Sequence, residues 1–345
     1  MPSLSRYASI VGIDRDVFMT VRGRSVSVLT IGFYLMEWFI YIGLFIFAQL
    51  FRRLIHPRFS DFSLSDPQIS HMTYSQRELL FPRMFVLMLT GGITSLSGGT
   101  INALSPRYSV TRKWWNTHST MLTILGTNAV QSVIVSVLKN ITGQARPDLI
   151  TRCVPNAESI GAGQSNIDIR SCGTDNLRAL ADGFRSFPSG TAATSFSNLT
   201  ILTFMILSRV NIYQHATSSN SITLPMTGFP ILFATLMSMS TLADNRHFLT
   251  DTIFGAAIGI SSACLIYRQY FPPAWKRPAV TTSSNGTKFE QDLTLAYEPK
   301  RFFHDQDVSW KVDPAEAKGD TEEPQELTVR NLTKKKYQTN SHVTV

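Results

Sequence analysis

Six long apolar stretches constrain this chain more than any other feature of its sequence. Each approaches or exceeds the ~20 residues that a helix needs to cross the hydrocarbon core of a bilayer. In lipid, every backbone polar group must find its partner within the segment, so each stretch is expected to be helical. The sequence therefore predicts an all-α polytopic membrane protein built as a six-transmembrane-helix bundle. The predicted spans are 27–51, 84–104, 118–138, 191–208, 224–243 and 252–270.

Polar segments flank these spans and divide the chain into three parts. Residues 1–26 form a cytosolic N-terminal arm, and the apolar run behind it is too long for a cleavable signal peptide. Residues 27–271 form the membrane domain. Residues 272–345 are polar, contain prolines and lack a sustained helical period, so we expect a largely disordered cytosolic tail.

Charge is scarce and unevenly distributed. Only 16% of the residues are charged and 43% are hydrophobic, which argues against an ordinary soluble domain. The tail holds equal numbers of acidic and basic side chains, so the whole net charge of +8 belongs to residues 1–271. A basic surface beside lipid either attracts anionic headgroups in general or serves an anionic lipid substrate, and both remain open. We expect membrane lipids, and no nucleic acid, as partners.

The distribution of Lys and Arg in the loops orients the bundle. It places the arm, the loop after the second span and the exit from the sixth span in the cytosol, although the first outer loop is also rich in arginine. The loop between the third and fourth spans then faces the outer or lumenal side. It contains Cys153 and Cys172, which we expect to pair if that side is oxidising, whereas Cys264 lies in the sixth span.

Four polar clusters fall at span ends on that same outer side. They are Lys139, Arg146 and Arg152 after the third span, the turn 188–190 before the fourth, Asp244, Arg246 and His247 at the end of the fifth, and Asp251 at the start of the sixth. Taken singly, each has an ordinary structural explanation as a snorkelling cation, a turn or a helix cap. Ionisable groups that point into a membrane bundle are nevertheless candidates for function, and here they gather on one side. The candidates, in chain order, are Lys139, Arg146, Ser189, Gly190, His247 and Asp251.

This set of residue types suits phosphoryl chemistry. Lys139 and Arg146 can neutralise phosphate oxygens, and the backbone N–H groups at the start of the fourth span offer a further anion site. His247 can act as a nucleophile. The spacing of four residues to Asp251 puts a carboxylate one helical turn away, where it can hold one ring nitrogen protonated and leave the other free to attack.

Three segments in order resemble the signature motifs of the type 2 phosphatidic acid phosphatase superfamily, the lipid phosphate phosphatases. They are "KNITGQARP", "SFPSGT" and "STLADNRHFLTD". Four further segments are similar to the fungal diacylglycerol pyrophosphate phosphatase branch of that superfamily, and the resemblance extends over roughly residues 60–273. These are "DPQISH", "RPDLITRC", "DGFRSFPSG" and "YRQYFPP".

The resemblance implies a membrane enzyme that needs no metal or other cofactor and removes phosphate from lipid phosphates through a phosphohistidine intermediate. It implies that His247 is the nucleophile and Asp251 its orienting partner. Lys139 and Arg146 would hold the phosphate with their side chains, and Ser189 and Gly190 with their amides.

Two positions depart from the motifs. The superfamily has His after Pro-Ser-Gly, where it protonates the leaving oxygen, and this chain has Thr191 in that part of the substrate site. It has Arg after the first Ser of the third motif, where it clamps phosphate, and this chain has Thr241. Loss of a general acid typically lowers the rate ~10²- to 10⁴-fold, and loss of such an Arg by ~10³-fold or more. His71 is the one obvious imidazole on the outer side that could replace the acid.

We therefore expect a weakened, Mg²⁺-independent lipid phosphatase acting on diacylglycerol pyrophosphate, phosphatidate or related lipids. The expected location is an endomembrane (ER, Golgi or vacuole) or the plasma membrane, with the site on the lumenal or outer face. One alternative is a catalytically silent relative that binds lipid phosphates or regulates an active homologue. Another is a phosphotransferase that uses the same histidine.

Overall fold

The computed structural model describes most of the membrane domain and short pieces of its flanks. The described residues are 18–21, 24–74, 78–104, 110–153, 166–167, 169, 172–174, 177–210, 223–274, 280–282, 288–290 and 295–297. The helices are α2 Val28–Leu54, the 3-10 turn η1 Pro67–Ile69, α3 Arg83–Ala103, α4 Val110–Thr142, α5 Leu149–Cys153, α6 Leu177–Gly183, α7 Gly190–Val210, α8 Thr223–Ala243 and α9 Leu249–Tyr270. Three antiparallel strand pairs complete the described elements: β1 Phe18–Val21 with β2 Arg24–Ser27, β3 Phe62–Ser63 with β4 Asn166–Ile167, and β5 Val280–Thr282 with β6 Lys288–Glu290.

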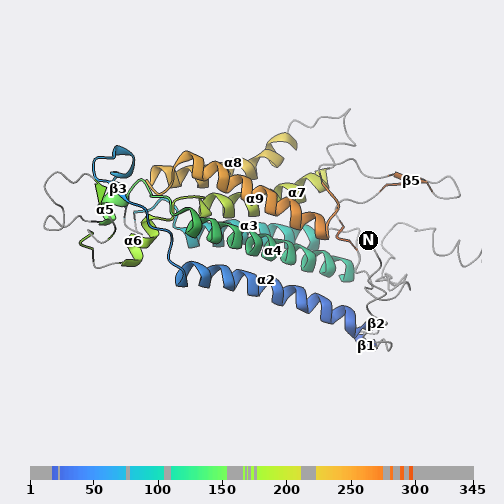
Figure 1. The fold of residues 1–345 in the computed structure, drawn as a ribbon. Helices are drawn as coiled ribbons and strands as arrows, with labels where there is room; N and C mark the ends of the chain where they lie inside the picture. The colour runs from blue at the N-terminus through green and yellow to red at the C-terminus, as the bar shows by residue number, and fades with distance from the viewer. Residues whose placement is uncertain are drawn as a thin grey trace, which may run out of the picture.

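Six of these helices are long and apolar enough to cross a membrane, and they lie side by side as one bundle (Figure 1). They are α2, α3, α4, α7, α8 and α9, which confirms the predicted all-α fold with six spans. The end of α4 and the start of α9 differ from the predicted span ends, and both differences involve candidate site residues. Helix α4 continues to Thr142, so Lys139 lies in its last turn, and α9 begins at Leu249, so Asp251 lies in its first turn. Apolar periodicity misses these turns because they are polar.

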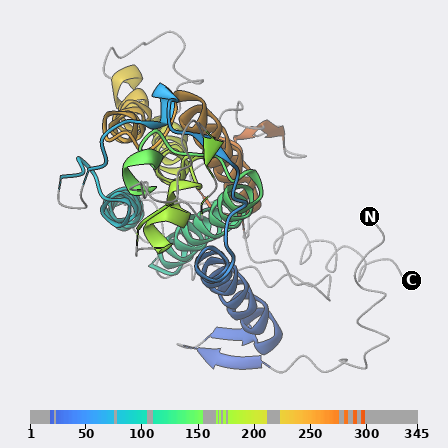
Figure 2. The same cartoon turned by 60° about the vertical axis from the view of Figure 1, so that its left-hand side comes forward.

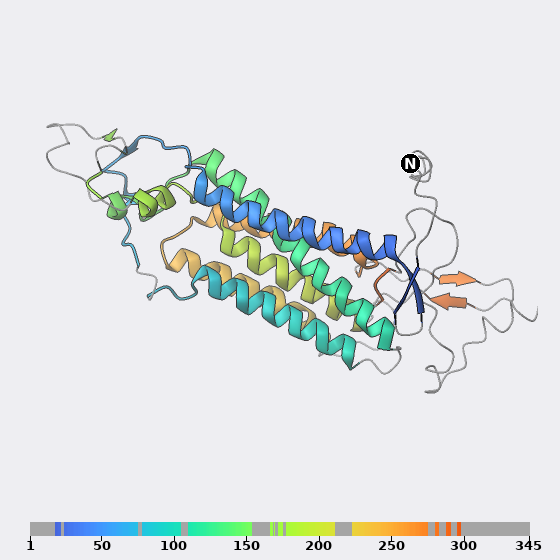
Figure 3. The same ribbon diagram turned by 90° about the horizontal axis from the view of Figure 1, so that it is seen from below.

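Helix α7 is the central helix of the bundle. It packs against α3, α4, α8 and α9, whereas α2 lies at the outside and packs against α4 (Figures 2 and 3). From Gly190 to Met205 every residue of α7 is buried except Phe196, which is half-buried. Its Ser, Thr, Ala and Asn side chains are small enough for neighbouring helices to approach closely, which is how membrane helices pack without a hydrophobic driving force.

Two glycines one helical turn apart set the contact between α9 and α7. A Cβ atom on Gly255 would collide with the carbonyl oxygen of Ser189, and one on Gly259 with that of Ala193. The absence of side chains at these positions lets the second and third turns of α9 touch the backbone at the start of α7. Because this contact lies one turn beyond Asp251, it brings the start of α9 against the start of α7.

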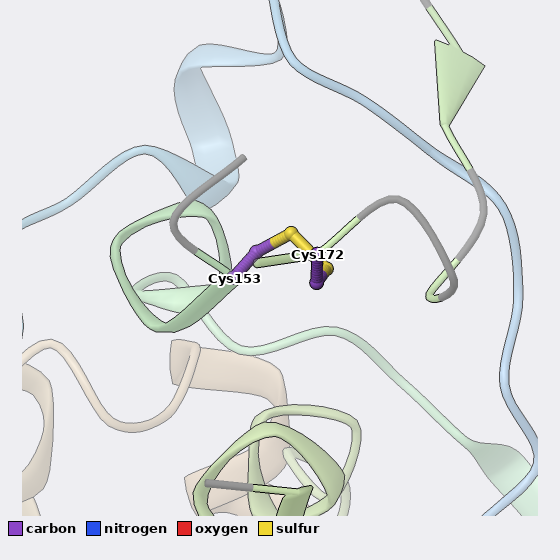
Figure 4. Close-up of a disulfide and its surroundings, with 2 residues drawn as sticks. All are labelled: Cys153 and Cys172. Carbon is purple, nitrogen blue, oxygen red and sulfur yellow. A yellow bond between two sulfur atoms is a disulfide. The ribbon is translucent and has the colours of Figure 1, made fainter. Parts of the chain in front are cut away.

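One end of the bundle carries α5, α6 and the β3–β4 pair, and we call it the α5–α6 end (Figure 1). A small apolar cluster that includes Phe62, Leu149, Leu180 and Phe184 holds these elements together. A disulfide joins Cys153 to Cys172, with Cα atoms 4.8 Å apart, as the sequence led us to expect (Figure 4). These elements form a cap over this end of the bundle.

The predicted cytosolic arm and disordered tail fall mostly outside the described residues. Within the arm, the structure describes the β1–β2 hairpin. Within the tail, it describes residues 272–274, β5, β6 and a short segment, 295–297, that contacts the bundle at the end opposite α5 and α6. There Trp115 Nε1 donates to the carbonyl oxygen of Tyr297 (2.9 Å), and the Tyr297 amide donates to that of Tyr270 (2.8 Å). The proposed boundaries at 26/27 and 271/272 stay predictions.

Candidate active site

The residues singled out from the sequence all lie at the α5–α6 end, on four neighbouring segments. Lys139 is in the last turn of α4, Arg146 in the loop behind it, Ser189 and Gly190 at the start of α7, Thr191 in its first turn, His247 between α8 and α9, and Asp251 in the first turn of α9. Segments separated by about a hundred residues in sequence thus converge on one place.

The loop that carries Arg146 is held against the segment that leads into α7. The Arg146 amide donates to the carbonyl oxygen of Gly183 (2.8 Å), and the Ser186 amide donates to that of Gln144 (3.0 Å). Gly143 allows this path because its φ is 57° and a Cβ there would collide with the backbone of Arg58. The glycine therefore explains how the first and second motifs come to lie side by side.

Lys139 and Arg146 form a buried cationic wall. Lys139 Nζ donates to the carbonyl oxygens of Arg185 (2.7 Å) and Ser186 (3.2 Å). Arg146 Nη2 lies 3.2 Å from Asp182 Oδ2, while its Nε and Nη1 are buried without a hydrogen-bond partner in the described part of the chain. Burial lowers the pKa of Arg146. Unsatisfied, buried donors of a charged group are costly, so this wall is suited to an anion.

Asp182 is the carboxylate that faces this wall. Burial works against its ionisation, but the charges of Arg146 and Lys139 outweigh that effect and lower the pKa of Asp182 well below its ordinary value. Its side chain remains about one-third exposed, so it reaches Arg146 from the solvent side. One carboxylate against two close cations leaves a net positive site.

His247 and Asp251 face one another, as their spacing of four residues predicts. His247 Nδ1 lies 3.8 Å from Asp251 Oδ2, which is too far for a hydrogen bond. That oxygen accepts from Ser186 Oγ (2.5 Å) and from the Phe248 amide (3.0 Å). The carboxylate is therefore held in place by two donors, and Nδ1 is turned toward it.

The imidazole of His247 is buried and neutral. Burial lowers its pKa well below the ordinary value, and the charges of Lys139, Arg146 and Arg246 lower it further. With Nδ1 turned toward Asp251, the opposite ring nitrogen, Nε2, is the one available for attack. A neutral imidazole among three cations is an arrangement suited to attack on an anionic phosphorus centre.

The start of α7 differs in one detail from what the resemblance implies. The Ser189 amide donates to the carbonyl oxygen of Asp251 (2.9 Å), because Gly255 lets α9 approach so closely, and it is therefore not free for phosphate. Ser189 Oγ accepts from the Ala192 amide (3.3 Å) and caps the helix. The amides of Gly190 and Thr191 lie between these two, in a first turn whose N–H groups lack intrahelical acceptors.

The two threonines that replace expected motif residues are both buried. Thr191 lies in the first turn of α7, where a neutral hydroxyl stands in for an imidazole. Thr241 donates its hydroxyl to the carbonyl oxygen of Ser238 within α8 (2.7 Å). His71 lies nearby, since its amide donates to the carbonyl oxygen of Pro147 (2.9 Å), but its side chain is exposed at the surface.

Three residues that interact with the candidate site were given no role from the sequence alone. Ser186 bonds Asp251, Asp182 pairs with Arg146, and Arg246 lies beside His247. Each lies within or next to a motif, but adjacency in sequence does not tell which side chain turns inward. Only the packing of α9 on α7 and of the two loops on each other supplies that information.

Comparisons with known proteins match the same part of the chain. A model of the PAP2 superfamily matches residues 120–275, the segment that contains every candidate site residue. The chain is 34% identical over 154 residues to "Probable diacylglycerol pyrophosphate phosphatase 1" of Schizosaccharomyces pombe, which covers 44% of this chain and 54% of the relative. It is 35% identical over 145 residues to "Diacylglycerol pyrophosphate phosphatase 1" of Saccharomyces cerevisiae, covering 41% and 48%. It is 27% identical over 168 residues to "Lipid phosphate phosphatase 2" of Arabidopsis thaliana, covering 49% and 56%.

The chain spans about half the length of the curated relatives it matches. No solved structure matches it. The matched segment begins within α4 and ends just after α9, so it includes the whole of α7, α8 and α9. The part of this chain that builds the site, residues 120–275, therefore belongs to the PAP2 superfamily.

Proposed function

We propose that this protein is an integral-membrane lipid phosphate phosphatase that acts at a reduced rate on diacylglycerol pyrophosphate, phosphatidate or related lipids. The observation that carries the proposal is a buried, neutral His247, turned by Nδ1 toward Asp251 and surrounded by the cations Lys139, Arg146 and Arg246. Relatives named for diacylglycerol pyrophosphate and lipid phosphates support the same substrate class.

The proposed reaction has two steps. In the first, His247 Nε2 attacks phosphorus, the N–P bond forms, and the bond from phosphorus to the leaving oxygen breaks. Diacylglycerol pyrophosphate expels phosphatidate, and phosphatidate expels the diacylglycerol oxygen, which takes its proton from water. Asp251 stabilises the imidazolium, and its 3.8 Å contact with Nδ1 would tighten as charge develops there. In the second step, water attacks the phosphohistidine, the N–P bond breaks, and inorganic phosphate leaves with His247 restored.

Lys139 and Arg146 would balance the phosphate charge, joined by the first-turn amides of α7. We propose that Ser189 takes part through its hydroxyl and by fixing α9, since its amide is bonded to Asp251. Gly190 and Thr191 would contribute their amides. Because these groups supply the positive charge, we propose that neither Mg²⁺ nor any other cofactor takes part.

A catalytically silent lipid-phosphate binder is the alternative, and Thr191 and Thr241 are the residues that favour it. Retention of the nucleophile with its orienting carboxylate favours an enzyme, because binding alone has no need of a His247–Asp251 pair. The rate losses expected from the two threonines are small beside the ~10²¹-fold accelerations that enzymes of phosphate monoesters reach. A slow catalyst is therefore compatible with both departures.

We further propose that the site lies on the lumenal or outer side of an endomembrane or the plasma membrane. The disulfide between Cys153 and Cys172 belongs to the cap over this end of the bundle, and disulfides persist on oxidising sides of membranes. The Lys and Arg distribution supports the same orientation.

The test is phosphate release from diacylglycerol pyrophosphate by the detergent-purified protein in EDTA, beside the His247→Ala variant. We expect wild-type release to persist in chelator and the variant to be inactive. Arg53→Gln serves as a control, because Arg53 is exposed at the end of α2. Release that stops in EDTA and returns with Mg²⁺ would contradict the metal-free reaction, and full activity in His247→Ala would place the chemistry elsewhere.

A further inference from the structure

Arg246 is the second arginine of the site, and one of its buried donors has no described partner. It lies in the connector between α8 and α9, directly before His247. Its Nη1 is buried without a hydrogen-bond partner among the residues that the structure describes. Asp244, two residues earlier, accepts instead from the Leu80 amide through Oδ1 (3.3 Å).

The surroundings of Arg246 disfavour its charge. Burial, followed by the charge of Arg146, lowers the pKa of Arg246 to about 10, although Asp182 and Asp244 act in the opposite direction. Arginine nevertheless stays protonated at neutral pH. Two guanidinium groups thus repel one another, and each keeps at least one buried donor without a described acceptor. An anion bound between them would offset the cost of this arrangement.

The backbone around Arg246 is well defined. The Arg246 amide donates to the carbonyl oxygen of Thr241 (3.0 Å), and the Asn245 amide to that of Leu242 (3.0 Å). Asn245 takes up a left-handed conformation with φ of 50°, and its side chain donates to the carbonyl oxygen of Met72 (3.3 Å). The turn thus folds back on the end of α8 and brings the backbone of Arg246 next to Thr241, whose own side chain is neutral and already bonded.

The charge of Arg246 acts on the His247 ring. Together with the charges of Lys139 and Arg146, it lowers the pKa of His247. The reacting phosphorus must lie within bonding reach of the His247 ring. A phosphoryl group at that position would meet Lys139 and Arg146 from the α4 side and Arg246 from the α8–α9 connector. Arginine is suited to this task because its planar fork can hold two oxygens at once.

We propose that Arg246 binds the phosphoryl group that is transferred to His247, as the third cation of the site together with Lys139 and Arg146. This inference rests on the proposed function. It assigns to Arg246 the charge that Thr241 cannot supply, and it makes Arg246 a catalytic residue in direct contact with substrate oxygens.

The experiment compares Arg246→Gln, Arg246→Lys and the control Arg53→Gln, which removes an exposed charge from the same end of the bundle. Orthovanadate is the probe, because it mimics a phosphoryl group and needs no lipid. Its affinity is read from the stabilisation of the detergent-purified protein against heat. In parallel, kcat/KM is measured for diacylglycerol pyrophosphate. Size-exclusion profiles verify that each variant is folded.

We expect Arg246→Gln to weaken vanadate binding at least about tenfold and to lower kcat/KM by ~10²- to 10³-fold. Arg246→Lys keeps the charge but not the fork, so it should fall between Arg246→Gln and wild type. Arg53→Gln should match wild type. An Arg246→Gln variant that binds vanadate and hydrolyses the lipid like wild type would overturn the inference. A loss of vanadate binding that is seen with the protein in anionic vesicles and is absent in lipid-free detergent would also overturn it, because such a loss would indicate a contact with lipid headgroups.

The two proposals fail in different ways. If wild type binds vanadate through Arg246 but does not hydrolyse diacylglycerol pyrophosphate, the anion site is supported and the phosphatase function is overturned. If wild type and Arg246→Gln hydrolyse this lipid equally well, only the role of Arg246 is overturned. A wild-type protein that neither binds vanadate nor hydrolyses lipid would overturn both.

Discussion

Replacing Gly255 by alanine should slow the enzyme although the residue touches no substrate. The added Cβ would collide with the carbonyl oxygen of Ser189 and lie 3.1 Å from the Cβ of Ala192. Both neighbours belong to the buried start of α7, where the backbone cannot shift as a flexible side chain could. The two helices must therefore separate by up to about 1 Å to restore ordinary van der Waals distances.

That displacement acts directly on the site. The Ser189 amide bonds the carbonyl oxygen of Asp251 (2.9 Å), so α9 and α7 move apart at the turn that positions the carboxylate against His247. A misplacement of about 1 Å typically lowers the rate ~10²-fold, and overpacking of this kind costs about 1–3 kcal/mol of stability. We therefore expect a folded, less stable Gly255→Ala protein with kcat/KM reduced ~10²-fold.

The assay is phosphate release from diacylglycerol pyrophosphate in detergent, with the melting temperature measured in parallel. Gly92→Ala is the matched control, because Gly92 lies within helix α3 and a Cβ there would meet nothing within 4 Å. That variant should keep wild-type activity and gain about 0.5–1 kcal/mol of helix stability. A Gly255→Ala protein with the kcat/KM of wild type would refute the idea that the α9–α7 contact sets the geometry of the site.

Two further predictions concern protons. Thr191→His should raise the kcat for phosphatidate by a larger factor than the kcat for diacylglycerol pyrophosphate, because an alkoxide leaving group needs a general acid and a phosphate monoester does not. Equal gains in kcat on both lipids would show that Thr191 does not set the substrate choice. The acid limb of the kcat/KM profile should lie below the ordinary imidazole pKa of ~6.5, because burial and neighbouring cations lower the pKa of His247 and keep it neutral to lower pH. In Arg246→Gln the limb should move up toward that value, and an unmoved limb would mean that the charge of Arg246 does not reach the ring.

Much of the fold could be predicted from local sequence. The six spans follow from apolar length, because lipid leaves the backbone of such a stretch no alternative to a helix. The helix ends were less predictable, since Lys139 and Asp251 belong to polar turns that apolar length does not include. The candidate site residues could be named because their types and spacing suit phosphate, and the disulfide because Cys153 and Cys172 share one loop.

Only the tertiary structure decided how the helices and loops that carry the candidate site residues pack against one another. The contact of Gly255 with Ser189 diverts an expected phosphate-binding amide to Asp251, and no local pattern shows this, because it depends on how closely two distant helices pack. Likewise, the sequence does not show which way the side chains of Asp182 in α6 and Arg246 in the α8–α9 connector turn. They join the site because folding places them beside Arg146 and His247, where partial burial makes each charge matter more than it would in water.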